Sequence, residues 1–146
     1  MSQFLTQERA KHALERVESV PRAVWAEYRR YVQSFPAVIR TIGLGQTVAT
    51  WMAKAGSRKE KEEQAYGLLL DHLEEWLLKS NKSSPYHSKT SKGGSKLIHH
   101  IGEFDQNDYL LAQAEAILYL DWLKKFANAL LVEPSKEPAG NAGEQP

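Results

Sequence analysis

Residues 105–131 read DQNDYLLAQAEAILYLDWLKKFANALL, and this stretch of the sequence decides the fold class. Its apolar residues recur at spacings of three and four, which is the period of an α-helix that buries one face. Asp105 stands immediately before this pattern, where its carboxylate can accept a hydrogen bond from a free backbone N–H group of the first turn. The stretch therefore predicts a long amphipathic helix. Its buried stripe consists of Tyr109, Ala112, Ala116, Tyr119, Leu120, Leu123, Phe126, Ala127 and Leu130.

The same helical period extends through most of the remaining chain, and it contains no convincing two-residue alternation of the kind that marks a strand. Apolar stripes cover residues 10–20, 24–35 and 66–77, and a shorter pattern at 96–101 predicts one helical turn. The predicted fold is therefore an all-α, single-domain helical bundle of about five to seven helices over residues 1–132.

A local signal marks the start of a central helix. Ser34 is placed to cap a helix that carries Pro36 in its first turn, where the missing N–H group of proline costs little. We expect Ile39 and Ile42 to form the buried side of this helix.

Two glycines, Gly43 and Gly45, interrupt the helical pattern and permit either a kink or a close approach of another backbone segment. The apolar pattern then resumes, and Gly56 is a suitable C-terminal cap. Ser57 followed by Glu60 fits a capping box that opens the next long helix. The resumed stripe that we expect to be buried consists of Val48, Ala49, Met52 and Ala53.

Two segments lack an apolar stripe. Residues 81–95 are rich in serine, lysine and glycine, and they predict a mobile basic loop. Residues 133–146 contain three prolines and two glycines with almost no large apolar residue, so we predict a disordered C-terminal tail there.

The formal net charge is only +1, but the charges are segregated along the chain. Residues 20–59 hold seven basic residues against one acid, and residues 79–102 hold five lysines and no acid. Residues 60–78 and 103–146 are acidic in balance. Clustered lysine and arginine residues can contact the phosphates of a nucleic-acid backbone. The other interpretation of the two basic blocks is that they form ordinary solvated surface. The phosphate interpretation predicts that the two basic blocks converge on one face.

No known catalytic, cofactor or metal motif is found, so we expect a non-enzymatic protein with no cofactor, no metal and no small-molecule substrate. The five histidines, which are scattered along the chain, have no chelating spacing. The chain has no cysteine and no apolar run near the roughly 20 residues needed to span a bilayer, which predicts a cytoplasmic protein without a membrane partner. The four tryptophans lie in or beside apolar stripes, and we expect them to pack in the core.

Three motifs point to a particular family. They are Gln7-x-Arg9-Ala10, the run from Phe35-Pro36-Ala37-Val38-Ile39 to Gly43-Leu44-Gly45-Gln46-Thr47-Val48-Ala49, and Tyr119-Leu120-x-Trp122-Leu123-Lys124-Lys125-Phe126-Ala127. In this order and spacing, over about residues 7–131, the chain resembles the small-subunit family of the Cmr (type III-B CRISPR) complex.

The resemblance implies an all-α subunit that stacks with copies of itself and with other Cmr subunits, alongside the guide RNA and its paired target RNA. It implies that cutting belongs to other subunits and that this one holds the duplex by nonspecific phosphate contacts. The motif match reaches Lys124 and Lys125, on the polar side of their helix. Charge placement adds the nucleic-acid-binding candidates Arg29, Arg30, Arg40, Lys54, Lys89, Lys92 and Lys96.

Two alternatives remain open at the level of sequence. A helical adaptor or scaffold that binds only protein partners would show the same stripes and loops. An enzyme of unrecognised type would require a pocket with a buried, paired carboxylate or histidine.

Overall fold

The computed structural model describes residues 2–133, and helix is the only regular structure in that range. The predicted all-α class is confirmed, and none of the described helices is long and apolar enough to cross a membrane. The α-helices are α1 (Ser2–Glu18), α2 (Trp25–Val32), α3 (Phe35–Ile42), α4 (Leu44–Ala55), α5 (Lys61–Glu75), α6 (Leu97–Glu103) and α7 (Gln106–Leu130). A 3-10 turn, η1 (Arg22–Val24), precedes α2, and a π-helical turn, η2 (Trp76–Ser80), extends α5.

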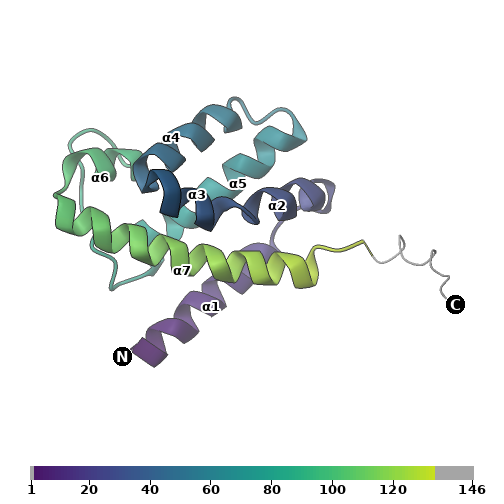
Figure 1. Cartoon of the computed structure of the whole chain (residues 1–146), viewed down its shortest axis with the longest axis horizontal. Coiled ribbons are helices and arrows are strands. Elements are labelled where there is room, and N and C mark those ends of the chain that lie inside the picture. The colour runs from purple at the N-terminus through teal and green to yellow at the C-terminus, as the bar shows by residue number, and fades with distance from the viewer. Residues whose placement is uncertain (1, 134–146) are drawn as a thin grey trace, which may run out of the picture.

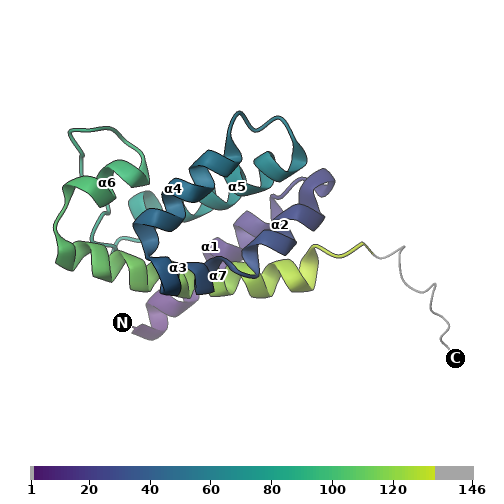
Figure 2. The ribbon, with the colours of Figure 1, turned by 45° about the horizontal axis from the view of Figure 1, so that its top comes forward.

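Helix α7 runs along the molecule and organises the other helices (Figure 1). It contacts α1 on one side and α2 and α3 on another, while α5 packs against both α2 and α4. Figure 2 shows the same order from a second direction, with α6 and the loop before it at the end opposite α2. The N-terminal half of α7 therefore lies near α6, and its C-terminal half lies near α2.

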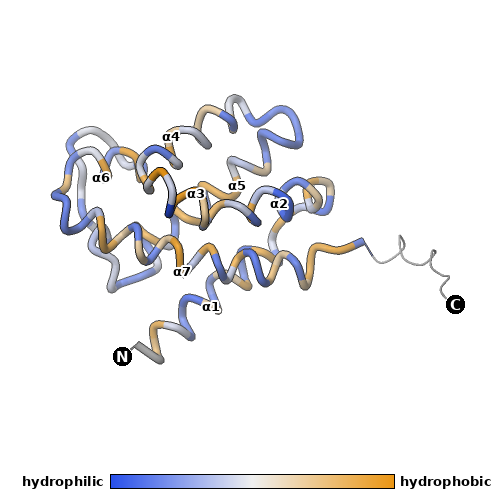
Figure 3. Tube along the Cα trace, viewed as in Figure 1, coloured by the Kyte–Doolittle hydropathy of each residue, from blue (hydrophilic) through white to orange (hydrophobic). Residues whose placement is uncertain are grey.

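The core forms where these helices meet, and apolar segments concentrate there in Figure 3. The predicted stripe of α7 is largely confirmed, since six of its residues are buried. Tyr109 and Phe126 are half-buried, and Leu130 is 42% exposed, because α7 ends there and the next residue, Leu131, enters the core instead. The buried residues of α7 are Ala112, Ala116, Tyr119, Leu120, Leu123 and Ala127.

Two predicted helix ends are confirmed by backbone contacts. The Asp105 carboxylate accepts a hydrogen bond from the backbone N–H of Asp108 at 2.9 Å, and α7 begins directly after it. Gly56 ends α4 with a φ of 48°, and its N–H donates to the carbonyl oxygen of Met52. The expected short helical turn near residue 96 is α6.

The two other predicted caps are wrong in their chemistry. Helix α3 does begin after Ser34, but the Ser34 hydroxyl donates to the Tyr31 carbonyl oxygen and caps no N–H group. Helix α5 begins four residues after Ser57, and the Glu63 carboxylate accepts from the backbone N–H groups of Lys59 and Glu60. Glu63 thus takes the role that we assigned to Glu60, and the capping box lies three residues later than predicted, with Glu60 at the N-cap in place of Ser57.

The Gly43–Gly45 interruption turns out to be both a break and a close approach. Gly43 has a φ of 91°, which separates α3 from α4. The freed N–H groups that follow donate to α7 side chains, from Leu44 to Gln113 Oε1 at 2.8 Å and from Gly45 to Tyr109 Oη at 3.0 Å.

This break also explains two errors in the predicted buried faces. Ile42 is 41% exposed, because α3 ends there and the chain turns at Gly43. Helix α4 restarts with a different phase, so Ala49, Met52 and Ala53 face outward. Its buried residues are Leu44, Thr47, Val48, Trp51 and Ala55.

The segment before α6 has no regular structure but is anchored at several points. The Tyr86 side chain is fully buried, and Asn81 is 1% exposed. The mobility that we expect for residues 81–95 stays a prediction. Of the predicted tail, residues 134–146 lie outside the described residues.

Candidate nucleic-acid interface

Five of the nine predicted nucleic-acid-binding residues gather along the seam between α7 and the α2–α3 pair. The seam is fixed by a Gln33–Asn128 hydrogen bond of 2.8 Å and by an Arg40–Asp121 ion pair of 3.8 Å. On α7, Lys124 and Lys125 are each three or four residues away from both Asp121 and Asn128. Residues at this spacing are neighbours on a helix surface, so both lysines lie beside the seam. We call the group formed by Arg29, Arg30, Arg40, Lys124 and Lys125 the seam patch.

The seam patch includes a cavity whose lining carries no carboxylate. Its volume is about 330 Å³, and Arg29 and Arg30 line it together with the amides of Gln33 and Asn128. Arg30 also lies over the Tyr31 ring, with its guanidinium carbon 5.1 Å from the ring centroid. Guanidinium groups are suited to phosphate contacts, and the acids that act on Arg30, Glu27 and Glu62, lie outside the lining of this cavity.

Three of the four remaining candidates, Lys89, Lys92 and Lys96, form a second group that we call the loop patch. Lys89 Nζ is 2.8 Å from Asp108 Oδ2 and lies over the Phe104 ring. Lys96 borders cavities that also hold Asp71 and Glu74. Acids therefore partly neutralise the loop patch, unlike the cavity of the seam patch.

The basic blocks converge only in part, since Arg58 of the first block and Lys96 of the second line the same cavity, whereas the seam patch and Lys89 are far apart. The seam patch meets α7 at Asn128 and the loop patch meets it at Asp108, 20 residues earlier. That separation is about 30 Å along a helix and about 200° around its axis, so the two contact points lie near opposite ends of α7, the helix labelled in Figure 1. Lys54 belongs to neither patch; its ammonium lies 5.6 Å from the centroid of the Tyr66 ring.

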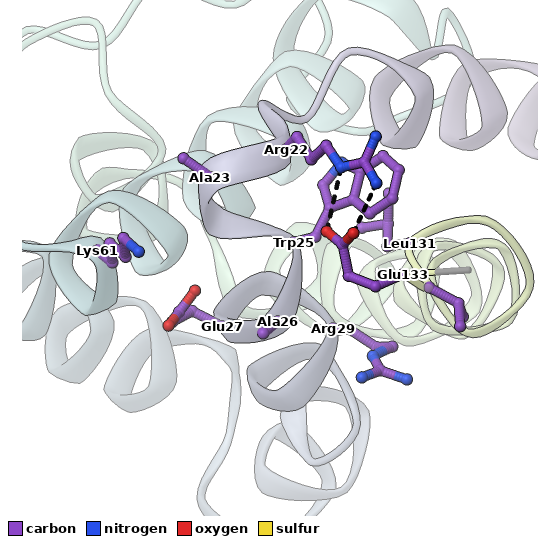
Figure 4. A pocket seen from close by; sticks show the side chains of 10 residues that line it. Arg22, Ala23, Trp25, Ala26, Glu27, Arg29, Lys61, Leu131 and Glu133 are labelled. Atoms are coloured by element: carbon purple, nitrogen blue, oxygen red, sulfur yellow. Dashed lines mark hydrogen bonds and ion pairs between the residues drawn. The ribbon is translucent and has the colours of Figure 1, made fainter. Parts of the chain in front are cut away.

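Another cavity, of about 800 Å³, lies beside α2 and the end of α7 (Figure 4). Arg22, Arg29 and Lys61 line it, but so do Glu27 and Glu133. Arg22 pairs with Glu133 through two hydrogen bonds of 2.6 and 3.2 Å, drawn as dashed lines. This mixture of charges makes the cavity a poorer phosphate site than the seam patch.

The enzyme alternative requires a buried and paired carboxylate or histidine in a pocket, and two buried histidines, His72 and His100, border cavities. His72, 5% exposed, lines a cavity of about 480 Å³ and shares a 2.8 Å hydrogen bond with the Tyr28 hydroxyl. Burial lowers the pKa of His72 to about 3 and raises the pKa of Tyr28. This pair is therefore a weak base and a weak acid near neutral pH.

The tryptophans and acids fill structural roles. Trp51 and Trp76 are buried, and Trp25 and Trp122 pack partly buried against the core. Trp76 Nε1 donates to Glu115 at 2.8 Å. Residues 2–133 contain no group of three or more histidine, aspartate or glutamate side chains arranged to hold a metal ion.

Sequence reasoning missed several residues that the fold brings to these sites. Gln33 and Asn128 are 95 residues apart, so no local pattern could pair them. Lys79 belonged to a basic block but was not selected, although it lines a carboxylate-free cavity beside the loop patch.

The described part of the chain is thus a small all-helical protein with basic patches on its surface. A family model described as CRISPR-associated protein (Cas_Cmr5) matches residues 5–130. The chain belongs to this CRISPR-associated Cmr family, in agreement with the resemblance found in its motifs.

Proposed function

We propose that this chain is a non-catalytic small subunit of a type III-B CRISPR effector complex, acting in the cytoplasm in antiviral defence. It helps to assemble the complex with other Cmr subunits and copies of itself. It also holds the duplex of guide RNA and target RNA through nonspecific phosphate contacts. The observation that carries this proposal is the seam patch, where Arg29 and Arg30 line a cavity without a carboxylate.

The chemistry of the patch suits the RNA backbone rather than the bases. Lysine and arginine contacts with phosphate are sequence-independent, individually weak and screened by salt. The two largest ring systems near the patch, Trp25 and Trp122, are packed against the core and so are not free to stack on bases. The isolated subunit should bind weakly, and assembly should multiply its contacts through effective concentration.

The test is the double charge reversal Arg29→Glu/Arg30→Glu, measured in the assembled complex. Retention of the guide–target duplex should fall by about tenfold or more at moderate salt, and the loss should shrink at high salt. The matched control is Lys11→Glu/Lys59→Glu, which changes the same charge at exposed positions outside both patches. The proposal fails if both double variants retain duplex equally well while the complex still assembles.

A protein-only adaptor is the second candidate, and one observation favours it. Helix α7 exposes Leu110, Leu111 and Leu118 at 51, 54 and 49%. Apolar groups of this kind mark protein contacts. If the Arg29/Arg30 reversal is silent but Leu111→Glu/Leu118→Glu prevents assembly, the adaptor function is the correct one.

A further inference from the structure

Two stacked tyrosines connect Lys54 to the seam patch. Tyr31 of α2 and Tyr66 of α5 have ring centroids 4.2 Å apart and ring planes within 8° of parallel. The Arg30 guanidinium of the seam patch lies over the Tyr31 ring, 5.1 Å from its centroid. The Lys54 ammonium lies over the Tyr66 ring at 5.6 Å. The two rings and the two cations therefore form one row, which we call the tyrosine bridge.

The tyrosine bridge crosses three helices and depends on how they pack. Helix α5 packs against both α2 and α4. Arg30 and Tyr31 lie in the last turn of α2, and Lys54 lies in the last turn of α4. Both helices therefore end beside Tyr66 of α5, an arrangement that no local sequence pattern could reveal.

The rings of the bridge are held from the core. The buried Trp51 ring meets the Tyr66 ring edge to face, with centroids 5.1 Å apart and planes inclined by 76°. Both tyrosines are half-buried, whereas Arg30 and Lys54 are exposed. A cation that lies over a fixed ring loses less conformational freedom when it contacts a ligand, so the bridge partly preorganises both cations.

The charges of the bridge stay open to an anion. Neither Arg30 nor Lys54 forms an ion pair with a carboxylate of the described chain. Glu27 and Glu62 act on Arg30 only from beyond ion-pair distance. Burial raises the pKa of Tyr66, so its hydroxyl adds no negative charge beside Lys54 at neutral pH.

The bridge presents cations rather than open aromatic faces. Each tyrosine ring has one face against the other ring, and a cation lies over each ring. A nucleobase therefore finds no free ring face on which to stack. Phosphates recur at every nucleotide of an RNA strand, so two cations in a row suit a strand backbone better than a single compact anion.

We propose that the tyrosine bridge extends the phosphate-binding surface of the seam patch to Lys54, so that one RNA strand contacts Arg30 and Lys54 together. Tyr31 and Tyr66 are positioning residues for these two cations. The choice of RNA as the ligand rests on the proposed function. An acidic protein surface presents a similar charge, and the experiment separates the two.

The experiment measures binding of an RNA duplex of about 12 base pairs to the full chain by fluorescence anisotropy at several salt concentrations. Lys54→Gln should weaken binding about threefold at low salt and reduce the salt dependence by about one released ion, because one phosphate contact is lost. Lys54→Arg should bind like the unmodified chain, since a guanidinium also lies favourably over a tyrosine ring. The matched control Lys59→Gln removes an exposed lysine outside the bridge and both patches, and it should weaken binding less than about 1.5-fold.

A double-mutant cycle tests the positioning role of Tyr66. Tyr66→Leu removes the ring and should weaken duplex binding about threefold, but less than about 1.5-fold when Lys54→Gln is already present. Tyr66→Phe keeps the ring and should bind like the unmodified chain. Circular dichroism checks that each variant is folded. A loss from Tyr66→Leu that is equal with and without Lys54→Gln overturns the positioning role, because the ring then acts through the fold.

Arg29→Gln separates this inference from the proposed function, because Arg29 belongs to the seam patch but not to the bridge. If Arg29→Gln weakens duplex binding while Lys54→Gln only matches Lys59→Gln, the bridge is overturned and the seam patch stands. If Arg29→Gln and Lys54→Gln are both silent, both proposals fail. If Lys54→Gln leaves duplex binding unchanged but prevents assembly with other subunits, the RNA assignment is wrong and an acidic protein surface is the ligand.

Discussion

Arg9 of α1 and Glu115 of α7 form a nearly buried ion pair, with Nε to Oε2 at 2.6 Å and Nη2 to Oε1 at 2.8 Å. The two side chains are 8 and 11% exposed. Glu115 also accepts from Trp76 Nε1, so one carboxylate joins α1, η2 and α7. The arginine of the Gln7-x-Arg9-Ala10 motif therefore fastens the first helix to the bundle.

Replacing Arg9 by methionine should destabilise the fold by about 3 kcal/mol, because it leaves the Glu115 carboxylate buried without its cation. Urea unfolding provides the measurement. Adding Glu115→Gln should recover about 1 kcal/mol or more, since the amide oxygen still accepts from Trp76 and carries no charge. The control is Arg22→Met, which breaks an exposed pair with Glu133 and should cost less than about 1 kcal/mol. Equal losses at Arg9 and Arg22 would contradict the structural role assigned to Arg9.

Acid should destabilise the protein through His72. Burial lowers the pKa of His72 to about 3 in the fold, while the unfolded value is near 6.5. The unfolded chain therefore binds a proton that the folded chain does not between these values, and stability is lost as the pH falls through this window. From pH 7 to pH 5 the loss should be about 2 kcal/mol. Burial also lowers the pKa of His12, which adds in the same direction.

Urea titrations at several pH values test this effect, with His72→Gln as the comparison. Glutamine does not titrate, so the variant should lose stability less steeply between pH 7 and pH 5, even if it is less stable at neutral pH. Parallel stability curves for the two proteins would show that another group carries the acid sensitivity.

Gly43→Ala should destabilise the fold by about 1–2 kcal/mol. The φ of 91° disfavours any side chain, and an added Cβ would lie 3.0 Å from Tyr109 Oη. Gly102→Ala is a matched control within α6, because a Cβ there meets nothing within 4 Å. It should be neutral or stabilise by up to about 1 kcal/mol through helix propensity. Thermal melts of both variants provide the measurement. Similar unfolding midpoints for Gly43→Ala and Gly102→Ala would contradict the close approach at Gly43.

Lys124→Glu/Lys125→Glu should weaken retention of the guide–target duplex by the assembled complex without unfolding the subunit. Lys125 is exposed and Lys124 half-buried, and neither belongs to the buried stripe of α7. The loss should be severalfold at low salt and should decrease as salt rises, because the contacts are electrostatic. Circular dichroism checks the fold. Duplex retention that is unchanged at every salt concentration would favour the protein-only adaptor.

Much of the secondary structure followed from local pattern. The stripe of α7, its Asp105 cap and the Gly56 helix end were all predicted, because each depends on residues within a few positions of one another. The buried face of α4 was not predicted correctly. The turn at Gly43 ends α3, and α4 starts again with different residues facing the core. The capping box lies three residues later than predicted, because Glu60 takes the N-cap position expected for Ser57 and Glu63 takes the role expected for Glu60.

The candidate sites were predicted in composition but not in arrangement. Charge placement identified Arg29, Arg30 and Arg40, yet it could not show that Lys124 and Lys125 share a seam with them. It also grouped them with Lys89, which the fold pairs with Asp108 at the other end of α7. Sequence order carries no information about which sides of a bundle two helices present.

By itself the sequence determined the helical class, the helix that organises the bundle, the segregation of charge and the motifs shared with the Cmr family. Only the tertiary structure decided that Arg9 is buried against Glu115, that the basic residues divide into two patches, and that His100 faces two carbonyl oxygens. The physical reason is the separation along the chain of the residues that interact. Helical period and capping depend on neighbours in the chain, whereas Arg9 and Glu115 are 106 residues apart and meet only when the whole bundle packs.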